Sequence, residues 1–322
     1  MRRRDFIARL GAAAWPLAAR AQQPDKVRLI GVLMGFDSEA RRWVAAFERK
    51  LAELGWKGGI DLRIEYRWSG DSPDQLRTRA AEIVKLNPDA ILVSNEPTLA
   101  VTSSATRTIP IVFANVTSPR LERHYDNVTG IIAIEPQVAK KWVSVLKALV
   151  PGIERVGFLN EPISTPKEFY PHIQAAAASH GLKLVSAAAS GLMLDTTIVG
   201  PEATIAQFAA EPNGGLVVMP SSITADLRPT IIRAAAQYRV PAIYGHRFFV
   251  VEGGLISYGT DIAQCFAQAA SYIDRILNGE TPAGLPLQPP SRYDLVLNLK
   301  TATAMGLDVP VNVLALADEV IK

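Results

Sequence analysis

The sequence predicts an α/β protein of two similar, doubly wound lobes, each a parallel sheet covered by helices on both faces. Segments rich in Val, Ile and Leu alternate with helix-length segments along residues 27–244, which is the pattern of parallel strands joined by helices. The order of landmarks in this stretch occurs twice, which indicates two copies of one unit. A chain of 322 residues is also longer than one hydrophobic core usually supports.

The repeat is defined by glycines, strands and prolines that recur at nearly constant spacing, 125 to 131 positions apart. The matched landmarks are Gly31 and Gly157, Gly55 and Gly181, the strands 90–94 and 215–219, and Pro110 and Pro241. One such match is expected by chance, but four in the same order indicate an internal duplication. We expect the repeat to end after Tyr244.

Turn and capping residues place further elements within this frame. Ser72, Pro73 and Gln75 predict the start of a helix, as N-cap, first helical residue and capping-box partner. After the repeat we expect a strand at 255–258, a helix at 262–277 and a strand at 293–298, which are too few for a third domain. These segments should complete the two lobes. We expect lobe 1 to hold residues 22–117 and 246–286, lobe 2 to hold residues 118–245 and 287–322, and hinges near 118–127, 245–250 and 287–291.

The first 21 residues have the features of an export signal. Arg2, Arg3 and Arg4 precede a modestly apolar stretch, and Ala19-Arg20-Ala21 has the small-x-small pattern of a cleavage site. The run from Arg3 to Ile7 resembles the twin-arginine signal. Residue 22 is Gln and not Cys, so we expect no lipid anchor and a periplasmic protein. The alternative is a basic, disordered N-terminus.

Charge and cysteine content exclude several classes of function. Removal of residues 1–21 takes away five of the 34 basic and one of the 31 acidic residues, leaving 29 against 30 and a net charge of −1. Nothing in this balance favours nucleic acid or a membrane surface as a partner. Cys265 is the single cysteine, so no internal disulfide can form, and its Ala-rich surroundings predict a core position.

Two facing lobes of this kind should line a ligand cleft with six loops, because parallel sheets bind ligands beyond the carboxyl ends of their strands. These loops are rich in hydroxyl and amide side chains, which suit a carboxylate or an amide. Phe36, Tyr244 and Phe248 offer aromatic surface, and acidic side chains could pair an amino group, so an amino acid or related carboxylate fits best. The candidate ligand-binding residues are Phe36, Asp37, Ser38, Ser94, Asn95, Glu96, Thr98, Asn115, Asn160, Glu161, Ser221, Ser222, Tyr244 and His246. The alternative is that the Ser, Asn and Thr side chains only cap the helices that follow.

Signatures of enzymes and metal sites do not occur. The chain has no G-x-S-x-G elbow, no P-loop and no G-x-G-x-x-G after its first strand. Its four His lie at no metal-ligand spacing. We therefore expect no catalytic residues, no cofactor and no metal. Alternating charges at residues 61–67 predict a solvated strand face or a partner surface.

Several short motifs in a fixed order resemble the periplasmic solute-binding proteins of ABC transporters, in the branch with tryptophan- and tyrosine-binding members. They extend from the signal to the last helix and are found at residues 3–7, 54–56, 64–68, 108–113, 251–259, 274–279 and 295–302. The resemblance implies the type I periplasmic-binding-protein fold, three crossings between the lobes and closure on a ligand. It also implies an ABC permease with its ATPase as the partner, and only peripheral contact with the membrane.

The chain departs from this family at two places beside the expected cleft. Relatives usually carry Asp-Pro-Val and a longer Gly-rich passage where this chain has residues 115–126, and a Gly-Thr pair where it has Asn95 and Glu96. The identity of the ligand therefore does not carry over. A sensory protein that feeds a membrane receptor would use the same fold and closure, so it stays open as the alternative to transport.

Overall fold

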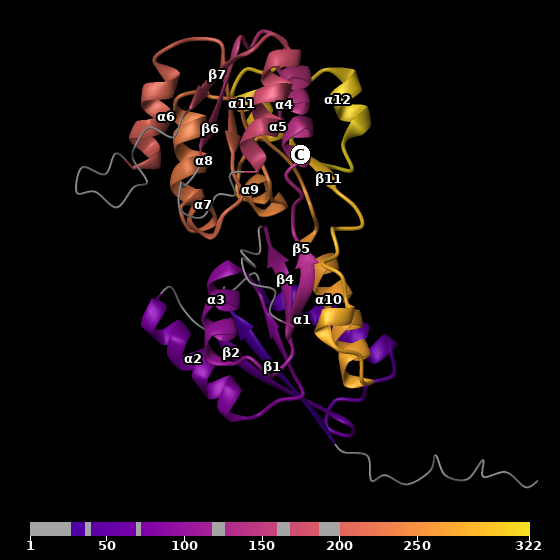
Figure 1. Cartoon of the computed structure of the whole chain (residues 1–322). Helices are drawn as coiled ribbons and strands as arrows, with labels where there is room; N and C mark the ends of the chain where they lie inside the picture. The colour runs from indigo at the N-terminus through magenta and orange to yellow at the C-terminus, as the bar shows by residue number, and fades with distance from the viewer. Residues whose placement is uncertain (1–26, 36–39, 69–71, 118–125, 160–167, 187–199) are drawn as a thin grey trace, which may run out of the picture.

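The structure, a computed structural model, describes residues 27–35, 40–68, 72–117, 126–159, 168–186 and 200–322. These residues form two sheets in two lobes, one above the other, with the C-terminus in the upper lobe (Figure 1). The predicted fold class, two parallel-sheet α/β lobes, is confirmed. The expected signal, and its cleavage point, lie outside the described residues.

The first lobe has a five-stranded parallel sheet in the order β2-β1-β3-β4-β5. Its elements are β1 (Arg28–Met34), α1 (Ala40–Glu53), β2 (Leu62–Trp68), α2 (Pro73–Lys85), β3 (Ala90–Val93), α3 (Glu96–Ala105), β4 (Ile111–Val116), β5 (Val128–Ile132), α10 (Ile262–Leu277) and the short 3-10 helix η1 (Pro282–Gly284). The central strands are buried throughout, as expected for a parallel sheet with both faces covered.

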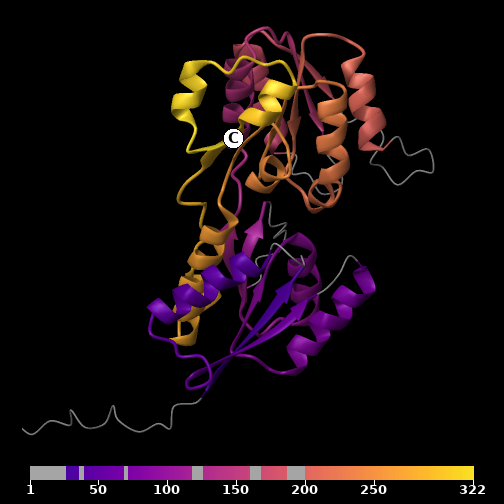
Figure 2. The same cartoon turned by 180° about the vertical axis from the view of Figure 1, so that it is seen from behind.

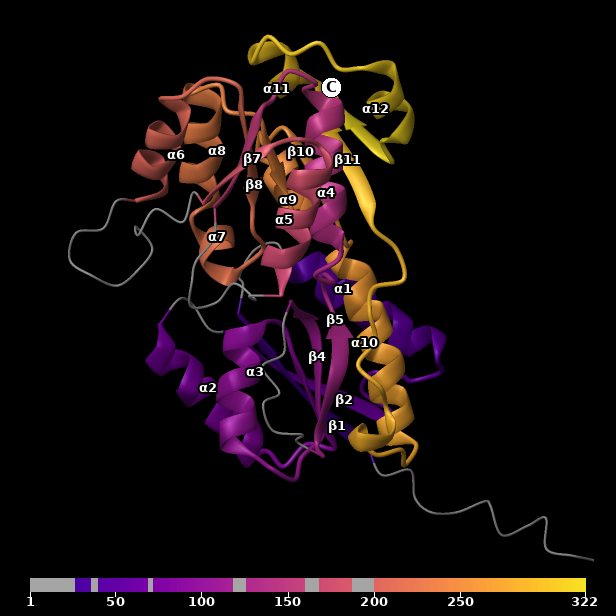
Figure 3. The ribbon, with the colours of Figure 1, turned by 45° about the horizontal axis from the view of Figure 1, so that its top comes forward.

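Two helix pairs cover the two faces of this sheet. On α1, buried residues recur every three or four positions, and Trp43 and Phe47 pack with α10, whose Phe266 ring lies 6.0 Å from that of Trp43. These two helices lie side by side in the view from behind (Figure 2). Helices α2 and α3 lie on the opposite face of the sheet (Figure 3). There Leu76 and Ile83 of α2 pack with buried residues of the strands. The expected N-cap Ser72 precedes α2, although its side chain makes no capping bond.

The second lobe has a seven-stranded sheet in the order β12-β11-β10-β9-β8-β6-β7, in which only β10 and β11 pair antiparallel among the described strands. Helices α4 and α5 cover one face, and α6, α8 and α9 cover the other. Its elements are α4 (Val138–Leu149), β6 (Arg155–Leu159), α5 (Phe169–Ser179), β7 (Lys183–Ser186), α6 (Pro201–Ala209), β8 (Gly214–Val218), α7 (Ser222–Asp226), α8 (Arg228–Gln237), β9 (Ala242–Tyr244), α9 (Arg247–Val251), β10 (Ile256–Gly259), β11 (Asp294–Asn298), α11 (Leu299–Ala304), α12 (Val311–Leu316) and β12 (Glu319–Ile321).

The two sheets repeat the same strand order. The order β2-β1-β3-β4-β5 of the first lobe reappears as β7-β6-β8-β9-β10 in the second. Ile111 of β4 pairs with Ile91, and Ala242, at the repeat spacing, pairs with Leu216 in the same way. The internal duplication is therefore real. The expectation that it ends after Tyr244 is wrong, because β5 and β10 form a fifth matching pair.

Two of the three expected lobe boundaries lie elsewhere in the structure. We expected residues 118–245 in lobe 2, but β5 pairs with β4 and so belongs to the first sheet, which places the first crossing at about residue 133. We expected residues 246–286 in lobe 1, but β10 pairs with β9 in the second sheet, so the second crossing lies between β10 and α10. The third lies between Gln288, which bridges to Ile131, and β11.

The physical reason for the first correction is the close fit of β5 against β4. A side chain at Gly130 would collide with the backbone oxygen of Phe113, so only glycine allows this approach. Asn127 donates from its amide to the Ile109 oxygen at 2.9 Å and holds the start of the strand. At the crossings themselves, the Thr260 hydroxyl donates to the Ala133 oxygen at 2.5 Å and joins the first two connections.

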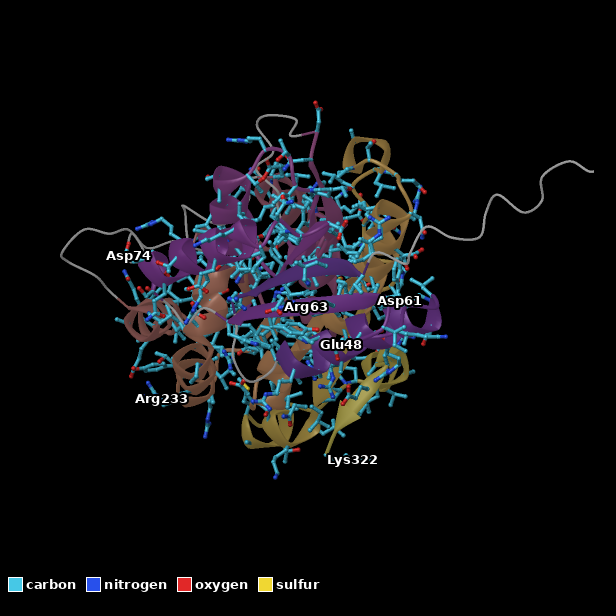
Figure 4. All side chains as sticks on the ribbon, turned by 90° about the horizontal axis from the view of Figure 1, so that it is seen from below. Glu48, Asp61, Arg63, Asp74, Arg233 and Lys322 are labelled. Atoms are coloured by element: carbon cyan, nitrogen blue, oxygen red, sulfur yellow. The ribbon has the colours of Figure 1, made fainter. Side chains whose placement is uncertain are left out.

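The outer surface of the first lobe carries the alternating charges of β2. Arg63 donates to Glu65 at 2.8 Å, and Arg67 donates to Glu82 of α2 at 2.9 Å. Figure 4 shows Arg63, Asp61 and Glu48 on the surface seen from below. On this exposed face the charged side chains pair with one another among the described residues, and such exposed ion pairs contribute little to stability.

Candidate functional site

A pocket between the lobes is lined from both sides at the carboxyl ends of equivalent strands. The first lobe contributes residues that follow β3 or lie at the end of β4, and the second contributes residues that follow β8 and β9. Its described lining is Asn95, Glu96, Asn115, Thr117, Ser221, Ala225, His246 and Phe248. The structure thus brings five of the candidate residues, Asn95, Glu96, Asn115, Ser221 and His246, to one place.

Six of the eight described lining residues form three pairs at the spacing of the internal repeat. Asn95 and Ser221 are 126 positions apart, the spacing of Gly31 and Gly157. Asn115 and His246 are 131 apart, as are Thr117 and Phe248, the spacing of Pro110 and Pro241. The pocket is therefore lined largely by pairs of equivalent positions, one from each lobe.

The first of these pairs caps helices. The Thr98 N–H donates to Asn95 Oδ1 at 3.0 Å, and the Asn95 N–H donates to Thr98 Oγ1 at 2.9 Å, which is a complete capping box at the start of α3. Ser221 and Thr224 form the same box on α7, with both bonds at 3.1 Å. The capping alternative therefore accounts for Thr98 and for the capping oxygens of Asn95 and Ser221.

Ser94 and Gly35 fix the loop beneath Asn95. The fully buried Ser94 hydroxyl accepts the Gly35 N–H at 2.8 Å. A side chain at Gly35 would collide with the Asn95 amide nitrogen, so glycine is required for Asn95 to take this position. Ser94 and Thr98 thus shape the loop without lining the pocket.

Glu96 connects the two loops of the first lobe. Its carboxylate accepts the Thr117 N–H at 2.5 Å, which ties the end of β4 to the first turn of α3. A carboxylate at this position also complements the partial positive charge of a helix N-terminus. Glu96 is the charged side chain of the described lining.

Asn115 lies in an irregularity of β4. Phe113 pairs with Gly130 and Val116 pairs with Ile132, so β4 has one residue more than β5 over this interval. Such a bulge re-aims side chains and is frequent beside binding sites. The Asn115 side chain is buried, and its Oδ1 has no hydrogen-bond partner among the described residues.

His246 lines the pocket from the second lobe, at the end of a row of stacked rings. Its imidazole stacks on Phe248 at 5.0 Å, Phe248 on Phe249 at 5.1 Å, and Phe249 on Tyr244 at 4.7 Å. Burial lowers the pKa of His246 to about 4, so its ring is neutral at neutral pH. Its Nδ1 is buried and, within the described chain, has no partner.

The remaining candidate residues divide into two groups. Tyr244 is only 1 % exposed and packs in the core, because the alternation of β9 turns it with Ala242 toward α9; burial accordingly raises its pKa. Ser222 is the first residue of α7, and its side chain is not described. Five further candidates, Phe36, Asp37, Ser38, Asn160 and Glu161, lie outside the described residues.

Three lining residues, Thr117, Ala225 and Phe248, were not among the candidate ligand-binding residues. Phe248 was expected only as aromatic surface, although the repeat spacing that relates Asn115 to His246 also relates Thr117 to Phe248. Ala225 was missed; it lies one helical turn after Ser221, so helical spacing could have indicated it. No helix in the described ranges is long and apolar enough to cross a membrane, and none of the described His, Cys, Asp and Glu side chains gather in threes as metal ligands would.

Comparison with known proteins places this architecture in a family. A curated tyrosine-binding protein of Clostridioides difficile is 21% identical over 272 residues, which cover 81% of this chain and 75% of the relative. The structure of a conserved domain protein of Vibrio cholerae superposes with a TM-score of 0.77 at 26% identity, over 92% of this chain and 100% of the other. The structure of an ABC domain from Streptococcus in complex with L-Trp superposes with a TM-score of 0.78 at 22% identity, over 91% of this chain and 99% of the other.

The family model described as ABC transporter substrate binding protein matches residues 30–321. This range contains all but the first two residues of β1 and covers both lobes, the three crossings and every residue that lines the pocket. The chain belongs to the family of ABC transporter substrate-binding proteins.

Proposed function

We propose that this protein captures a small organic ligand, an amino acid or a related carboxylate, and delivers it to an ABC permease with its ATPase. The family consists of binding proteins that work outside the cytoplasmic membrane. We further propose that the chain reaches the periplasm through its N-terminal signal by the twin-arginine route, without a lipid anchor. Because the matching family is linked to transporters, we favour transport over sensing.

The observation that carries this proposal is the pocket with matched walls on two lobes. A ligand that contacts both walls binds the closed arrangement better than an open one, so it shifts the equilibrium toward closure by that difference in affinity. The three crossings provide the connections about which the lobes could close. A closed complex then differs in shape from the empty protein, which a permease can distinguish.

The ligand class is supported by the chemistry of the lining. Hydroxyl, amide and imidazole groups lie beside one aromatic ring, that of Phe248, and one carboxylate, that of Glu96. Such a mixture suits a small molecule with a polar head and an apolar body. The relatives named above include a tyrosine-binding protein and a complex with L-Trp, which supports the same class.

The test combines ligand identification with a blocked pocket. Native mass spectrometry of protein purified without denaturation should reveal a bound small molecule, and calorimetry with that molecule should give one site. Ala225→Leu places bulk in the pocket and should abolish binding. The control is Ala304→Leu, an exposed helical position on α11, which should bind as the wild type does. Full binding by a folded Ala225→Leu variant would place the ligand elsewhere.

A further inference from the structure

Two buried polar atoms in the pocket remain without partners among the described residues, and they belong to one pair of repeat-equivalent positions. They are Oδ1 of Asn115, which is 8% exposed, and Nδ1 of His246, which is 6% exposed. A buried polar atom without a partner destabilises the protein that carries it. Other buried polar groups of the lining, such as the Asn95 oxygen, are engaged in capping. This pair therefore requires an explanation other than stability.

Both side chains are held in place by the structure around them. Asn115 owes its orientation to the extra residue of β4, which interrupts the ladder with β5. His246 is fixed by the row of rings that continues through Phe248 into the core. Rigid presentation of a polar atom reduces the entropy lost on binding, which is how a binding site gains affinity and selectivity.

The chemistry of the pair limits what it can bind. An amide oxygen accepts hydrogen bonds and cannot donate, so the group opposite Asn115 must be a donor. The His246 imidazole is buried and neutral, so it offers no positive charge to an anion. The Glu96 carboxylate lines the same pocket and would repel a negatively charged group. An ammonium group, or an uncharged N–H donor, meets all three conditions, whereas a carboxylate meets none.

We propose that Asn115 and His246 are the specificity-determining pair of this pocket, and that together they hold the amino end of the ligand from the two lobes. This inference rests on the proposed function and refines it: the carboxylate of an amino acid would lie away from this pair. Because one atom comes from each lobe, both can contact the same group only when the lobes are together. The pair thus links recognition of the amino group to closure.

The experiment uses tyrosine and two fragments of it as calorimetric probes. Tyramine lacks the carboxylate, and hydroxyphenylpropionate lacks the ammonium group. The variants are Asn115→Leu, which removes the acceptor at similar volume, and His246→Phe. We expect each variant to lower the affinity for tyrosine and for tyramine by about tenfold to a hundredfold. The affinity for hydroxyphenylpropionate should stay within about twofold of its wild-type value.

A matched control separates this role from general effects of burial. Thr102 of α3 also has a buried side-chain oxygen without a partner in the described chain, but it does not line the pocket. Thr102→Val should leave the affinity of all three probes unchanged. Asn115→Leu should raise the melting temperature of the empty protein while it weakens binding, a combination that a structural residue does not give.

The outcomes distinguish the inference from the proposed function. If Asn115→Leu weakens the binding of hydroxyphenylpropionate as much as that of tyramine, the pair does not recognise the amino group. The inference then fails while the proposed function stands. Unchanged affinity for tyrosine in both variants leads to the same conclusion. If the wild type binds none of the three probes, nor tryptophan nor leucine, the amino-acid function is wrong and the inference falls with it.

Discussion

Asn95 can contribute to helix capping and to ligand binding, and substitution can separate these roles because they use different atoms. Its Oδ1 accepts the Thr98 N–H at 3.0 Å and caps α3, which leaves the Nδ2 group to donate to a ligand. Asn95→Ala removes both groups. Asn95→Asp keeps a capping oxygen, since Asp is as good an N-cap as Asn, but it replaces the donor by an acceptor.

The expected magnitudes follow from the two bonds. Loss of an N-cap costs about 1 kcal/mol, which lowers the melting temperature of a lobe of this size by roughly 2–4 °C. Loss of a donor to a charged ligand group costs about 1.5–3 kcal/mol, or about tenfold to a hundredfold in affinity. We therefore expect Asn95→Ala to lose both stability and affinity, and Asn95→Asp to lose affinity while it melts close to the wild type.

Differential scanning calorimetry on the empty proteins and titration calorimetry with the identified ligand measure the two effects. If Asn95→Asp melts as early as Asn95→Ala, the capping assignment is wrong. If Asn95→Asp binds with wild-type affinity, Asn95 is a helix cap and nothing more. Thr98→Val, which breaks the other half of the box without removing Nδ2, should lower stability and leave affinity nearly unchanged.

Three further predictions concern export, closure and pH. Changing Arg3 and Arg4 to Lys should trap precursor in the cytoplasm, whereas wild-type protein should begin at Gln22 on N-terminal sequencing; a normal periplasmic yield of the double variant would exclude the twin-arginine route. Small-angle scattering should give a smaller radius of gyration with ligand, and an unchanged radius at saturation would contradict closure. Burial lowers the pKa of His246 from its ordinary value of 6.5 to about 4, so the unfolded chain takes up this proton first as the pH falls. The free energy of unfolding, measured by urea denaturation, should therefore drop between pH 6.5 and 4 by on the order of 3 kcal/mol. In His246→Phe the free energy of unfolding should depend less on pH over this range.

The sequence predicted the repeat well because its landmarks mark backbone geometry. Gly31 and Gly157 occupy equivalent positions in β1 and β6, where added side chains would meet Ile83 and Phe208 of the covering helices. Because these glycines are required by packing inside each lobe, their spacing can be recognised even where the two halves of the sequence differ at surface positions. The lobe boundaries were less predictable, because an apolar strand such as β5 can join the edge of either sheet. Its assignment depends on contacts with β4 that no local pattern reveals.

Positions in the candidate site were predictable where a strand end determines them, and less so where side-chain direction does. Asn95 and Ser221 lie two and three residues after the ends of their strands, so the topology alone brings them to the pocket. Tyr244 also ends a strand, but the period of two turns its ring into the core. The bulge that orients Asn115 depends on the partner strand, so the sequence alone could not indicate it.

The duplication explains how one protein can have both a stable scaffold and a selective pocket. At the first pair of equivalent positions, both lobes keep the same device, a capping box that satisfies a helix N-terminus in each. At the second pair the lobes differ, with an amide on one side and an imidazole on the other, and neither unsatisfied atom contributes to the fold of its lobe. Two identical walls would present identical groups to a ligand, whereas Asn115 and His246 present different ones. The asymmetry between equivalent positions is therefore where we expect selection for one ligand to have acted, and exchange of the two side chains, Asn115→His with His246→Asn, should change ligand preference more than it changes stability.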